Sequence, residues 1–368
     1  MTDMTVTKNH DVVVIGAGQA GLAIGYFLAR QGRDFKILDA ADRPAAAWRE
    51  RWDSLQLFTS VRYDALPGLT FPGDPDRYPT RDEVVDYLTA YAREFDLPIE
   101  LNSRVHTVRR SKGGYAVELD DRTYEAAQVV IATGPFQTPF VPPIAERLDA
   151  DVVQMHSTAY RSPQSLPDGR VLVVGGGNTG FQIAEELSAS REVHLSIGSR
   201  QTPLPQRIAG RDLFWYLDTT GLIRKTKESR IGRRMRQRED TLIGSRPRRL
   251  RRHGVRLQGR AVDAAGSTVS FSDATRLDVR TVIWATGFRL DHSWIDVPVF
   301  EGAGGVVHDR GVTNSPGLYF LGLLWQHTRG SALVGWVKDD ADYLAAQISA
   351  FSAAPARPTT STEMSTAS

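Results

Sequence analysis

Residues 11–21 read Asp-Val-Val-Val-Ile-Gly-Ala-Gly-Gln-Ala-Gly, and this stretch decides the fold. Four apolar residues typical of β-strands, Val12 to Ile15, lead directly into Gly16-x-Gly18-x-x-Gly21, and a helix-like run follows. In a dinucleotide-binding turn, the first glycine allows the tight bend and the second lets the backbone approach a pyrophosphate. The third lets the helix pack against the strand. The order of strand, glycines and helix therefore predicts a dinucleotide-binding turn.

An acidic residue stands at the expected place beyond this turn. The next strand-like segment, residues 35–38, ends in Asp39, which lies 18 residues after Gly21. A carboxylate at this place accepts hydrogen bonds from ribose hydroxyls, and its charge would repel a 2′-phosphate. The first turn is therefore expected to hold FAD or NAD.

The same pattern occurs a second time, with a different ending. A strand-like run leads into Gly175-x-Gly177-x-x-Gly180, but the following strand ends in Ser199-Arg200 and has no acid. A guanidinium beside a hydroxyl offers charge-assisted hydrogen bonds to a phosphate. The second turn is therefore expected to prefer NADPH, with an ordinary surface arginine as the alternative interpretation of Arg200.

Each glycine turn is followed by a later strand that ends in Ala-Thr-Gly, at residues 132–134 and 285–287. This nested repeat predicts an α/β fold with two Rossmann-like dinucleotide-binding domains, the NADPH domain being inserted into the FAD domain. The expected bounds are a flexible N-terminus at 1–9, the FAD domain at 10–145 and 291–351, the inserted NADPH domain at 146–290, and a disordered tail at 352–368.

Three further elements can be placed by their local pattern. Residues 79–83, Pro-Thr-Arg-Asp-Glu, predict a helix start, and Val84, Val85, Leu88 and Tyr91 supply the i, i+3, i+4, i+7 stripe of an amphipathic helix. Two strands are expected around Val105 and over 115–119, and a final helix is expected over 331–348. The start of that helix would direct its N-terminus, with its partial positive charge, toward the flavin.

Composition excludes several classes of function. Of 368 residues, 41% are hydrophobic and 24% charged, with a net charge of +2, which is typical of a folded protein. The absence of Cys excludes disulfides, thiolate catalysis, iron–sulfur clusters and a dithiol relay. No metal site is predicted. There is no apolar run of about 18 residues and no signal-peptide core, so we expect no transmembrane segment and a cytoplasmic location.

Positive charge is concentrated in one stretch, residues 221–256, which holds 14 Lys and Arg against three acids. One interpretation is a nucleic-acid patch. No aromatic residue is interleaved there for base stacking. We therefore expect exposed helical faces, and no nucleic-acid partner.

Taken together, the motifs resemble the flavin-containing monooxygenases, in particular the bacterial class B flavoprotein monooxygenases. The resemblance covers roughly residues 10 to 350. It rests on the two glycine patterns with Asp39, the Ala47-Trp48 loop, the two Ala-Thr-Gly segments, and Gly317-Leu-Tyr-Phe-Leu-Gly322. Such enzymes share the two-domain fold of thioredoxin reductase. The resemblance implies that NADPH reduces FAD, that O2 adds at flavin C4a, and that the hydroperoxide oxygenates a small organic sulfide, amine or ketone.

The candidate site residues follow from these motifs. For the cofactors they are Gly16, Gly18, Gln19, Ala20, Gly21, Asp39, Ala47, Trp48, Ala132, Thr133, Gly134, Gly175, Gly177, Asn178, Thr179, Gly180, Ser199, Arg200, Ala285, Thr286, Gly287, Gly322 and Leu323. No catalytic residue is certain, because this chemistry needs no protein nucleophile. His156, Gln326 and His327 are candidates. A structural link between the domains is the alternative for His156, and a polar approach to the last helix is the alternative for the other two.

Two other functions remain open from the sequence. One is an NADPH-dependent flavoprotein reductase or oxidase that passes electrons to a quinone, ferredoxin or oxygen. The other is a non-catalytic nucleotide-binding redox sensor or transporter partner. A homodimer is one option for the assembly.

Overall fold

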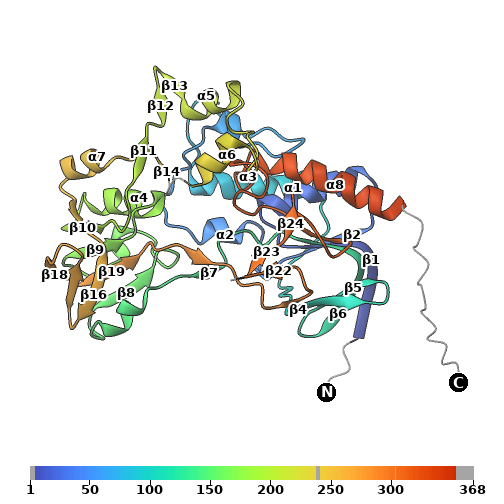
Figure 1. The fold of residues 1–368 in the computed structure, drawn as a ribbon, viewed down its shortest axis with the longest axis horizontal. Helices are drawn as coiled ribbons and strands as arrows, with labels where there is room; N and C mark the ends of the chain where they lie inside the picture. Colours follow the sequence, from blue (N-terminus) through green and yellow to red (C-terminus); the bar gives the residue numbers. More distant parts are fainter. Residues whose placement is uncertain (1–4, 238–240, 303, 354–368) are drawn as a thin grey trace, which may run out of the picture.

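The computed structural model describes residues 5–237, 241–302 and 304–353, and in it two sheets lie side by side (Figure 1). The first sheet has ten strands: β1 (Thr5–Ile15), β2 (Phe35–Leu38), β3 (Ile99–Glu100), β4 (Thr107–Ser111), β5 (Gly114–Glu118), β6 (Arg122–Ile131), β21 (Ile295–Asp296), β24 (His308–Asp309), β25 (Val312–Thr313) and β26 (Leu318–Phe320). The second sheet has five: β8 (Val153–His156), β9 (Val171–Val174), β10 (Val193–Ser196), β15 (Arg256–Gln258) and β19 (Thr281–Trp284).

Strand β1 lies between β2 and β6 and runs parallel to both, with Val14 opposite Ile37 on one side and Val130 on the other. The side chains of Val12 to Val14 are completely buried. A parallel strand covered on both faces needs such an unbroken apolar run. The strand begins earlier than expected. Residues 5–9 pair with β6, so the prediction of a flexible N-terminus is wrong for them. Residues 1–4 lie outside the described residues.

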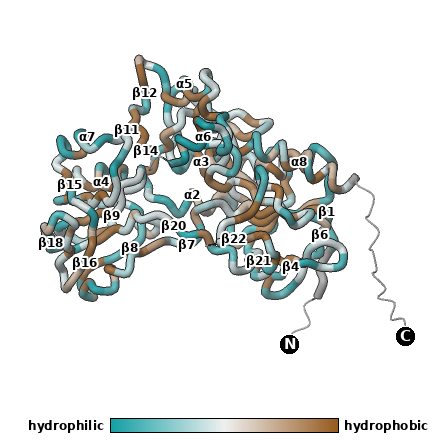
Figure 2. Tube along the Cα trace, in the orientation of Figure 1, coloured by the Kyte–Doolittle hydropathy of each residue, from teal (hydrophilic) through white to brown (hydrophobic). Residues whose placement is uncertain are grey.

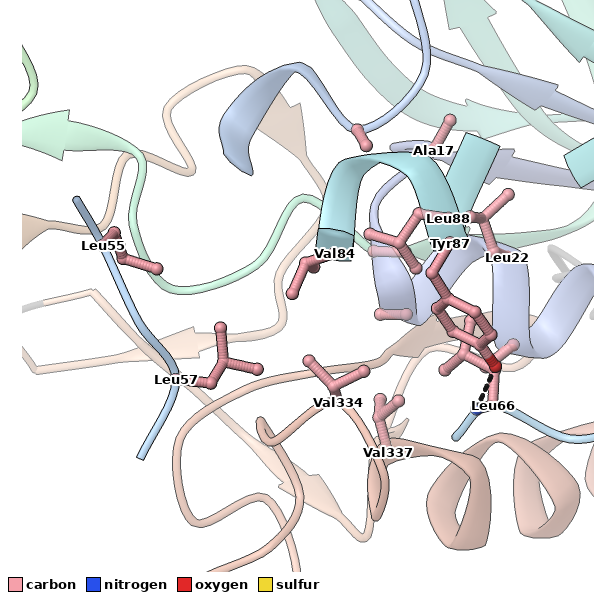
Figure 3. Packing of buried hydrophobic residues seen from close by; sticks show 14 of the residues in the cluster. Ala17, Leu22, Leu55, Leu57, Leu66, Val84, Tyr87, Leu88, Val334 and Val337 are labelled. Carbon is pink, nitrogen blue, oxygen red and sulfur yellow. Dashed lines mark hydrogen bonds between the residues drawn. The ribbon is translucent and has the colours of Figure 1, made fainter. Parts of the chain in front are cut away.

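One face of the first sheet is covered by α1 (Gln19–Arg30), α3 (Arg81–Glu94) and α8 (Val337–Ala353). Figure 3 shows Leu22 of α1 beside Leu88 of α3, with Val337 of α8 in the same apolar cluster. The hydroxyl of Tyr87 accepts the N–H of Leu66 at 2.7 Å, and this hydrogen bond holds the loop around Leu66 against the helices. Helix α3 starts at Arg81, within the segment predicted to begin a helix, and Thr80 and Glu83 form a capping box there.

The final helix differs from the prediction in both of its ends. Residues 331–336 form turns, and α8 begins at Val337 and continues to Ala353, so Ser352 belongs to the helix rather than to a tail. A Cβ on Gly335 would lie 1.8 Å from the carbonyl oxygen of Tyr63, so the segment before the helix packs closely against a neighbouring loop. The rest of the predicted tail lies outside the described residues. The strand expected around Val105 begins at Thr107.

The second sheet is sandwiched between α4 (Asn178–Leu187) and a small antiparallel sheet of β16 (Ala261–Ala265), β17 (Thr268–Phe271) and β18 (Arg276–Asp278). Alternate residues of β9 explain the two layers. Val171 and Val173 share one buried cluster with Phe181 of α4. Leu172 shares another with Phe271 of β17.

Two short strands connect the sheets. β7 (Thr138–Pro139) and β20 (Phe288–Arg289) pair antiparallel where the chain leaves the first sheet and where it returns (Figure 2). The remaining short elements are α2 (Ala46–Arg49), α5 (Leu213–Thr219), α6 (Arg230–Arg236), α7 (Pro247–Arg252), η1 (Val61–Tyr63), η2 (Pro143–Arg147), η3 (Pro163–Ser165), β11 (Thr202–Leu204), β12 (Arg207–Ile208), β13 (Arg211–Asp212), β14 (Thr241–Ile243), β22 (Phe300–Glu301) and β23 (Gly305–Val306).

Residues 201–237 and 241–245, which we call the arm, extend from the second sheet and contact the part of the chain that belongs to the first (Figure 1). Thr226 of the arm forms an isolated β-bridge with Thr328, and the N–H of Lys227 donates to the carbonyl of His327 at 2.8 Å. The hydroxyl of Tyr78 donates to the carbonyl of Gln206.

The basic stretch lies mainly on α6 and α7, where Figure 2 shows hydrophilic residues over both helices. Their arginines, including Arg233 and Arg251, are exposed, as expected for solvated helical faces. None of the described helices combines the length and the apolar character needed to span a bilayer.

Candidate functional site

The first glycine turn is packed tightly on two sides and open on the third. Gly16 has φ +109°, and a Cβ there would lie 2.6 Å from the carbonyl oxygen of Ala132. A Cβ on Gly21 would lie 1.8 Å from the carbonyl oxygen of Gly16, whereas a Cβ on Gly18 would meet no atom within 4 Å. Helix α1 begins at Gln19, so its unpaired N–H groups and positive dipole end adjoin this open side. The residues therefore fit a bound pyrophosphate.

Asp39 follows the last residue of β2 and is already held by the backbone. Its Oδ2 accepts the N–H of Ala17 at 2.6 Å, and its Oδ1 accepts the N–H of Ala41 at 2.9 Å. A carboxylate has about four acceptor positions, so both oxygens can still accept a ribose hydroxyl. The two backbone contacts fix the carboxylate beside the glycine turn.

Replacing Asp39 by Ala should weaken FAD binding by on the order of 2 kcal/mol, the value of a hydrogen bond to a charged group. Asp39→Asn retains one acceptor oxygen and should lose less. The dissociation constant of FAD, titrated by fluorescence into flavin-free protein, measures both. Equal affinity of the wild type and the Ala variant would show that Asp39 does not bind the cofactor.

Gln19 joins three segments around the start of α1. Its Oε1 accepts the indole N–H of Trp48 at 2.9 Å, and its Nε2 donates to the carbonyl of Ala332 at 3.4 Å. A Cβ on Gly322 would lie 3.0 Å from the Cβ of Ala20, so the turn after β26 rests on the same helix end. Ala47 is exposed on α2, and Leu323 is half-buried beyond the turn. The structure thus gathers these predicted residues around one helix N-terminus.

The Ala-Thr-Gly segment after β6 closes the turn from the other side. Ala132 is buried, and its N–H donates to the carbonyl of Ile15 at 2.8 Å. Thr133 is exposed and its hydroxyl accepts from Gln137. Gly134 has φ +72° and would place a Cβ in open space.

The second glycine turn repeats the geometry of the first. A Cβ on Gly175 would lie 2.1 Å from the carbonyl oxygen of Ala285, and one on Gly180 would lie 2.0 Å from that of Gly175. A Cβ on Gly177 would meet nothing within 4 Å. Helix α4 begins at Asn178, so this turn also fits a pyrophosphate.

The neighbours of the second turn connect it to the arm and to the ribbon of β7 and β20. Asn178 accepts the N–H of Ile243 at 2.9 Å through its side-chain oxygen, and Thr179 beside it is half-buried. The hydroxyl of Thr286 donates to the carbonyl of Phe140. The carbonyl of Gly287 accepts the N–H of Phe140 at 3.0 Å.

Ser199 and Arg200 are both exposed just beyond β10. The structure adds Arg260, which the sequence analysis missed. Its Nε and Nη2 donate to the carbonyl of Gly198 at 3.1 and 2.7 Å, so a second guanidinium lies beside the same strand end. No local pattern pointed to Arg260, because its position depends on the pairing of β15 with β10.

His156 is buried, and both of its ring nitrogens have partners. Nε2 lies 3.0 Å from the carbonyl oxygen of Gly287, and because a carbonyl can only accept, Nε2 carries the proton. Nδ1 lies 3.1 Å from the hydroxyl of Thr158. Burial lowers the pKa of His156, so the ring is neutral at physiological pH. These contacts favour the structural alternative, in which His156 holds the strand end that leads back to the first sheet.

Gln326 and His327 differ in their burial and in the hydrogen bonds that they already make. Gln326 is completely buried, accepts the N–H of Leu323 and donates to the carbonyl of Arg310, so both ends of its amide serve the backbone. His327 is half-buried, and burial lowers the pKa of its ring. Its backbone contacts both Ser331 and Lys227, at the place where the arm meets the C-terminal part of the first sheet.

Comparison with known proteins relates this arrangement to established families. Residues 13–207 match the model of the pyridine nucleotide-disulphide oxidoreductases. The chain is 45% identical to an uncharacterized CzcO-like oxidoreductase of Geobacillus kaustophilus, over 91% of this chain and 97% of that one. It is 27% identical to a probable indole-3-pyruvate monooxygenase of Arabidopsis thaliana, over 78% and 77% of the two chains.

Among solved structures, a flavin-containing monooxygenase from Stenotrophomonas maltophilia aligns with a TM-score of 0.79 and 29% identity, covering 94% of this chain and all of that one. The resemblance to bacterial flavin-containing monooxygenases and the two-dinucleotide-domain fold class are thereby confirmed. The chain is an oxidoreductase, and it belongs to the family of pyridine nucleotide-disulphide oxidoreductases.

Proposed function

We propose that this oxidoreductase is an FAD-dependent monooxygenase that uses NADPH to oxygenate a small organic sulfide, amine or ketone. One observation carries the proposal: two glycine turns of matching geometry lie at the strand ends of two neighbouring sheets, one beside Asp39 and the other beside Ser199-Arg200. The flavin-containing monooxygenase of Stenotrophomonas maltophilia supports it. A steroid monooxygenase solved with NADP shares the fold at 17% identity.

FAD, once reduced by NADPH, supplies the activation of O2 in such enzymes. The residues of this chain bind and orient the two cofactors. We assign the first glycine turn and Asp39 to FAD, and the second turn with Ser199 and Arg200 to NADPH. The bounds of the two units, 10–145 with 291–351 and 146–290, remain part of this proposal, with β1 extended to residue 5.

The absence of Cys separates this proposal from the disulfide reductases of the same family. Those enzymes need a dithiol to pass electrons from flavin to a disulfide, and no Cys occurs among the 368 residues. Oxygenation needs no such group. What it needs is a site from which water is excluded, and the aromatic rings and apolar side chains packed against residues 333–337 can provide it.

The experiment that tests the function starts from purified protein loaded with FAD. NADPH should bleach the flavin, and its consumption should rise when methyl phenyl sulfide is added, with the sulfoxide as product. Consumption that yields peroxide alone, or that reduces an added quinone, would instead establish a reductase or oxidase. Flavin that NADPH does not reduce would point to a non-catalytic sensor.

Arg200→Ala should remove most of the preference for NADPH over NADH. A guanidinium meets the 2′-phosphate through charge-assisted hydrogen bonds worth on the order of 1.5–3 kcal/mol, or roughly 10- to 150-fold in binding. The change should appear mainly in the KM for NADPH and should leave NADH nearly unaffected. Arg251→Ala, an exposed arginine on α7, is the matched control.

Arg260 can share this role, since it lies beside the same strand end. In that case Arg200→Ala alone has a partial effect, and Arg200→Ala with Arg260→Ala removes the preference. Two results would show that neither arginine binds the 2′-phosphate. One is a wild type that uses NADPH and NADH equally well, and the other is a double variant in which the KM rises equally for both coenzymes.

A further inference from the structure

Three buried polar side chains meet between the arm and the first half of the chain. Ser60 and Asp64 flank η1, and Asp212 is the last residue of β13 and the N-cap of α5. Their exposed fractions are 0, 1 and 7%, so all three are removed from water. Ser60 and Tyr78 both face the carboxylate of Asp212 and act to lower its pKa, while Asp212 acts to raise the pKa of Asp64. The three side chains therefore form one cluster, which we call the acid cluster.

Each member of the acid cluster has an oxygen without a hydrogen-bond partner within the described part of the chain. Asp64 accepts the hydroxyl of Thr59 at 2.6 Å through Oδ1, and Asp212 accepts the N–H of Phe214 at 2.6 Å through Oδ1. The Oδ2 atoms of both acids and the Oγ of Ser60 remain unpartnered. A buried acceptor without a donor is costly. The hydroxyl of Ser60 has one proton and can serve only one of the two carboxylates, so at least one carboxylate oxygen lacks a donor.

The positively charged side chain of Arg207, near the acid cluster, makes its direct contacts with other residues. The guanidinium of Arg207, which acts on Asp212, lies over the ring of Tyr78 at 5.4 Å and donates to the carbonyl of Asp76. Burial raises the pKa of Asp212, and it raises the pKa of Asp64 to about 7. A water molecule could fill the missing hydrogen bonds, and protonation can neutralise Asp64, whereas a bound organic cation would supply donors and offset negative charge at the same time.

Aromatic rings stand next to the acid cluster. Phe214, which follows Asp212, stacks on Phe58 with ring centres 5.9 Å apart and lies 5.5 Å from Trp336. Tyr63, which precedes Asp64, stacks on Trp336 at 5.5 Å. Carboxylates combined with aromatic faces are the surroundings in which proteins recognise organic cations.

The acid cluster also adjoins the first glycine turn. The carbonyl of Ala332 accepts from Gln19 at the start of α1, and four residues later Trp336 contacts the rings of Tyr63 and Phe214. Gly335, between them, packs on the backbone of Tyr63. One short segment thus connects the proposed FAD turn to the acid cluster.

We propose that Ser60, Asp64 and Asp212 form a subsite for an organic cation, and that the substrate carries an ammonium group bound there. The ammonium would donate to the three unpartnered oxygens, and its methylene groups would lie against the aromatic rings. The inference rests on the proposed monooxygenase function, because it takes this subsite as the specificity-determining end of the substrate site.

A matched pair of probes tests the subsite. 2-(Methylthio)ethylamine and methyl propyl sulfide have nearly the same shape and the same sulfide, but the first carries an ammonium group. Binding of each to the FAD-loaded protein is measured by calorimetry without NADPH. The wild type should bind the amine about 10-fold or more tightly, the value of a charge-assisted contact. Asp212→Asn and Asp64→Asn should each remove most of this difference and leave the neutral sulfide unchanged.

Two further variants serve as controls. Glu228→Gln changes an exposed acid of the same arm and should alter neither affinity. Ser60→Ala removes an unpartnered hydroxyl and should reduce only the affinity for the amine, which keeps the test readable if an Asn variant fails to fold. Equal binding of the two probes by the wild type, or equal losses for both probes in the variants, would overturn the subsite and leave the acid cluster as a hydrated structural feature.

NADPH-dependent sulfoxide formation, measured on both probes, separates this inference from the proposed function. Oxygenation of methyl propyl sulfide without any preference for the amine would support the monooxygenase and refute the subsite. Preferential binding of the amine without oxygenation of either probe would refute the monooxygenase, while the cation subsite would stand.

Discussion

Gly21→Ala should loosen the packing of α1 on β1 and abolish FAD binding, whereas Gly18→Ala should fold normally and lose only FAD affinity. The added carbon at residue 21 would lie 1.8 Å from the carbonyl oxygen of Gly16, and both sides of that contact are backbone. The helix must therefore move, at a cost of about 1–3 kcal/mol or more. The carbon at residue 18 would meet no protein atom, but it would occupy the side from which a pyrophosphate approaches.

Thermal unfolding of flavin-free protein and the dissociation constant of FAD distinguish the two effects. Gly18→Ala should keep the melting temperature and weaken FAD by roughly 10- to 150-fold, as expected for the loss of one charge-assisted contact. Gly180→Ala and Gly177→Ala form the matched pair at the second turn and should act on NADPH in the same way. An unchanged FAD affinity in Gly18→Ala would mean that the open side of the first turn is not the cofactor side.

Asp64→Asn should stabilise the protein at pH 8 by up to about 4 kcal/mol and have little effect at pH 4. Burial raises the pKa of Asp64 from 3.8 to about 7, so the folded state holds this proton more tightly than the unfolded state does. Stability from this group is present below about pH 4 and is lost as the pH rises to about 7, at about 1.4 kcal/mol per pKa unit. Asparagine has the same shape and no proton to lose.

Denaturant unfolding of both proteins between pH 4 and pH 8 measures this effect, because other titrating groups cancel in the difference. The difference should grow between about pH 4 and pH 7 and then level off. A difference that does not change with pH would show that Asp64 titrates normally in the folded state. If the acid cluster binds an organic cation, an amine ligand should restore stability to the wild type above pH 7 and not to the variant.

Local sequence patterns predicted the elements whose interactions are themselves local. The glycine turns could be predicted from the sequence because Gly16 and Gly21, which contact each other, are only five residues apart. The start of α3 could be predicted from residues 79–83, because Thr80 and Glu83, which form its capping box, are only three residues apart. The two-sheet fold followed from the repetition of these signals, together with a family resemblance.

Features made by distant residues were missed or misplaced. The early start of β1 depends on pairing with β6, more than a hundred residues away. Helix α8 starts late, after a segment in which Gly335 packs on the backbone of the distant Tyr63. Asp64 and Asp212 lie in segments that nothing in the sequence brings together, and the same holds for Arg260 beside Gly198. Such contacts are set by packing between segments, which propensity and periodicity do not encode.

The pairing of β26 with β6 also determines the order in which the chain can fold. Residues 132–317 separate the two strands, and the second sheet is built entirely from residues between them. During synthesis, β6 leaves the ribosome long before β26, so the second sheet can fold before β26 is available to pair with β6. The pairing of β7 with β20 holds the two ends of the folded second sheet together. The chain that must be closed when β26 pairs with β6 is therefore much shorter than residues 132–317, which lowers the entropic cost of closure. The second sheet can thus be complete in a nascent chain before the first sheet gains its strand β26.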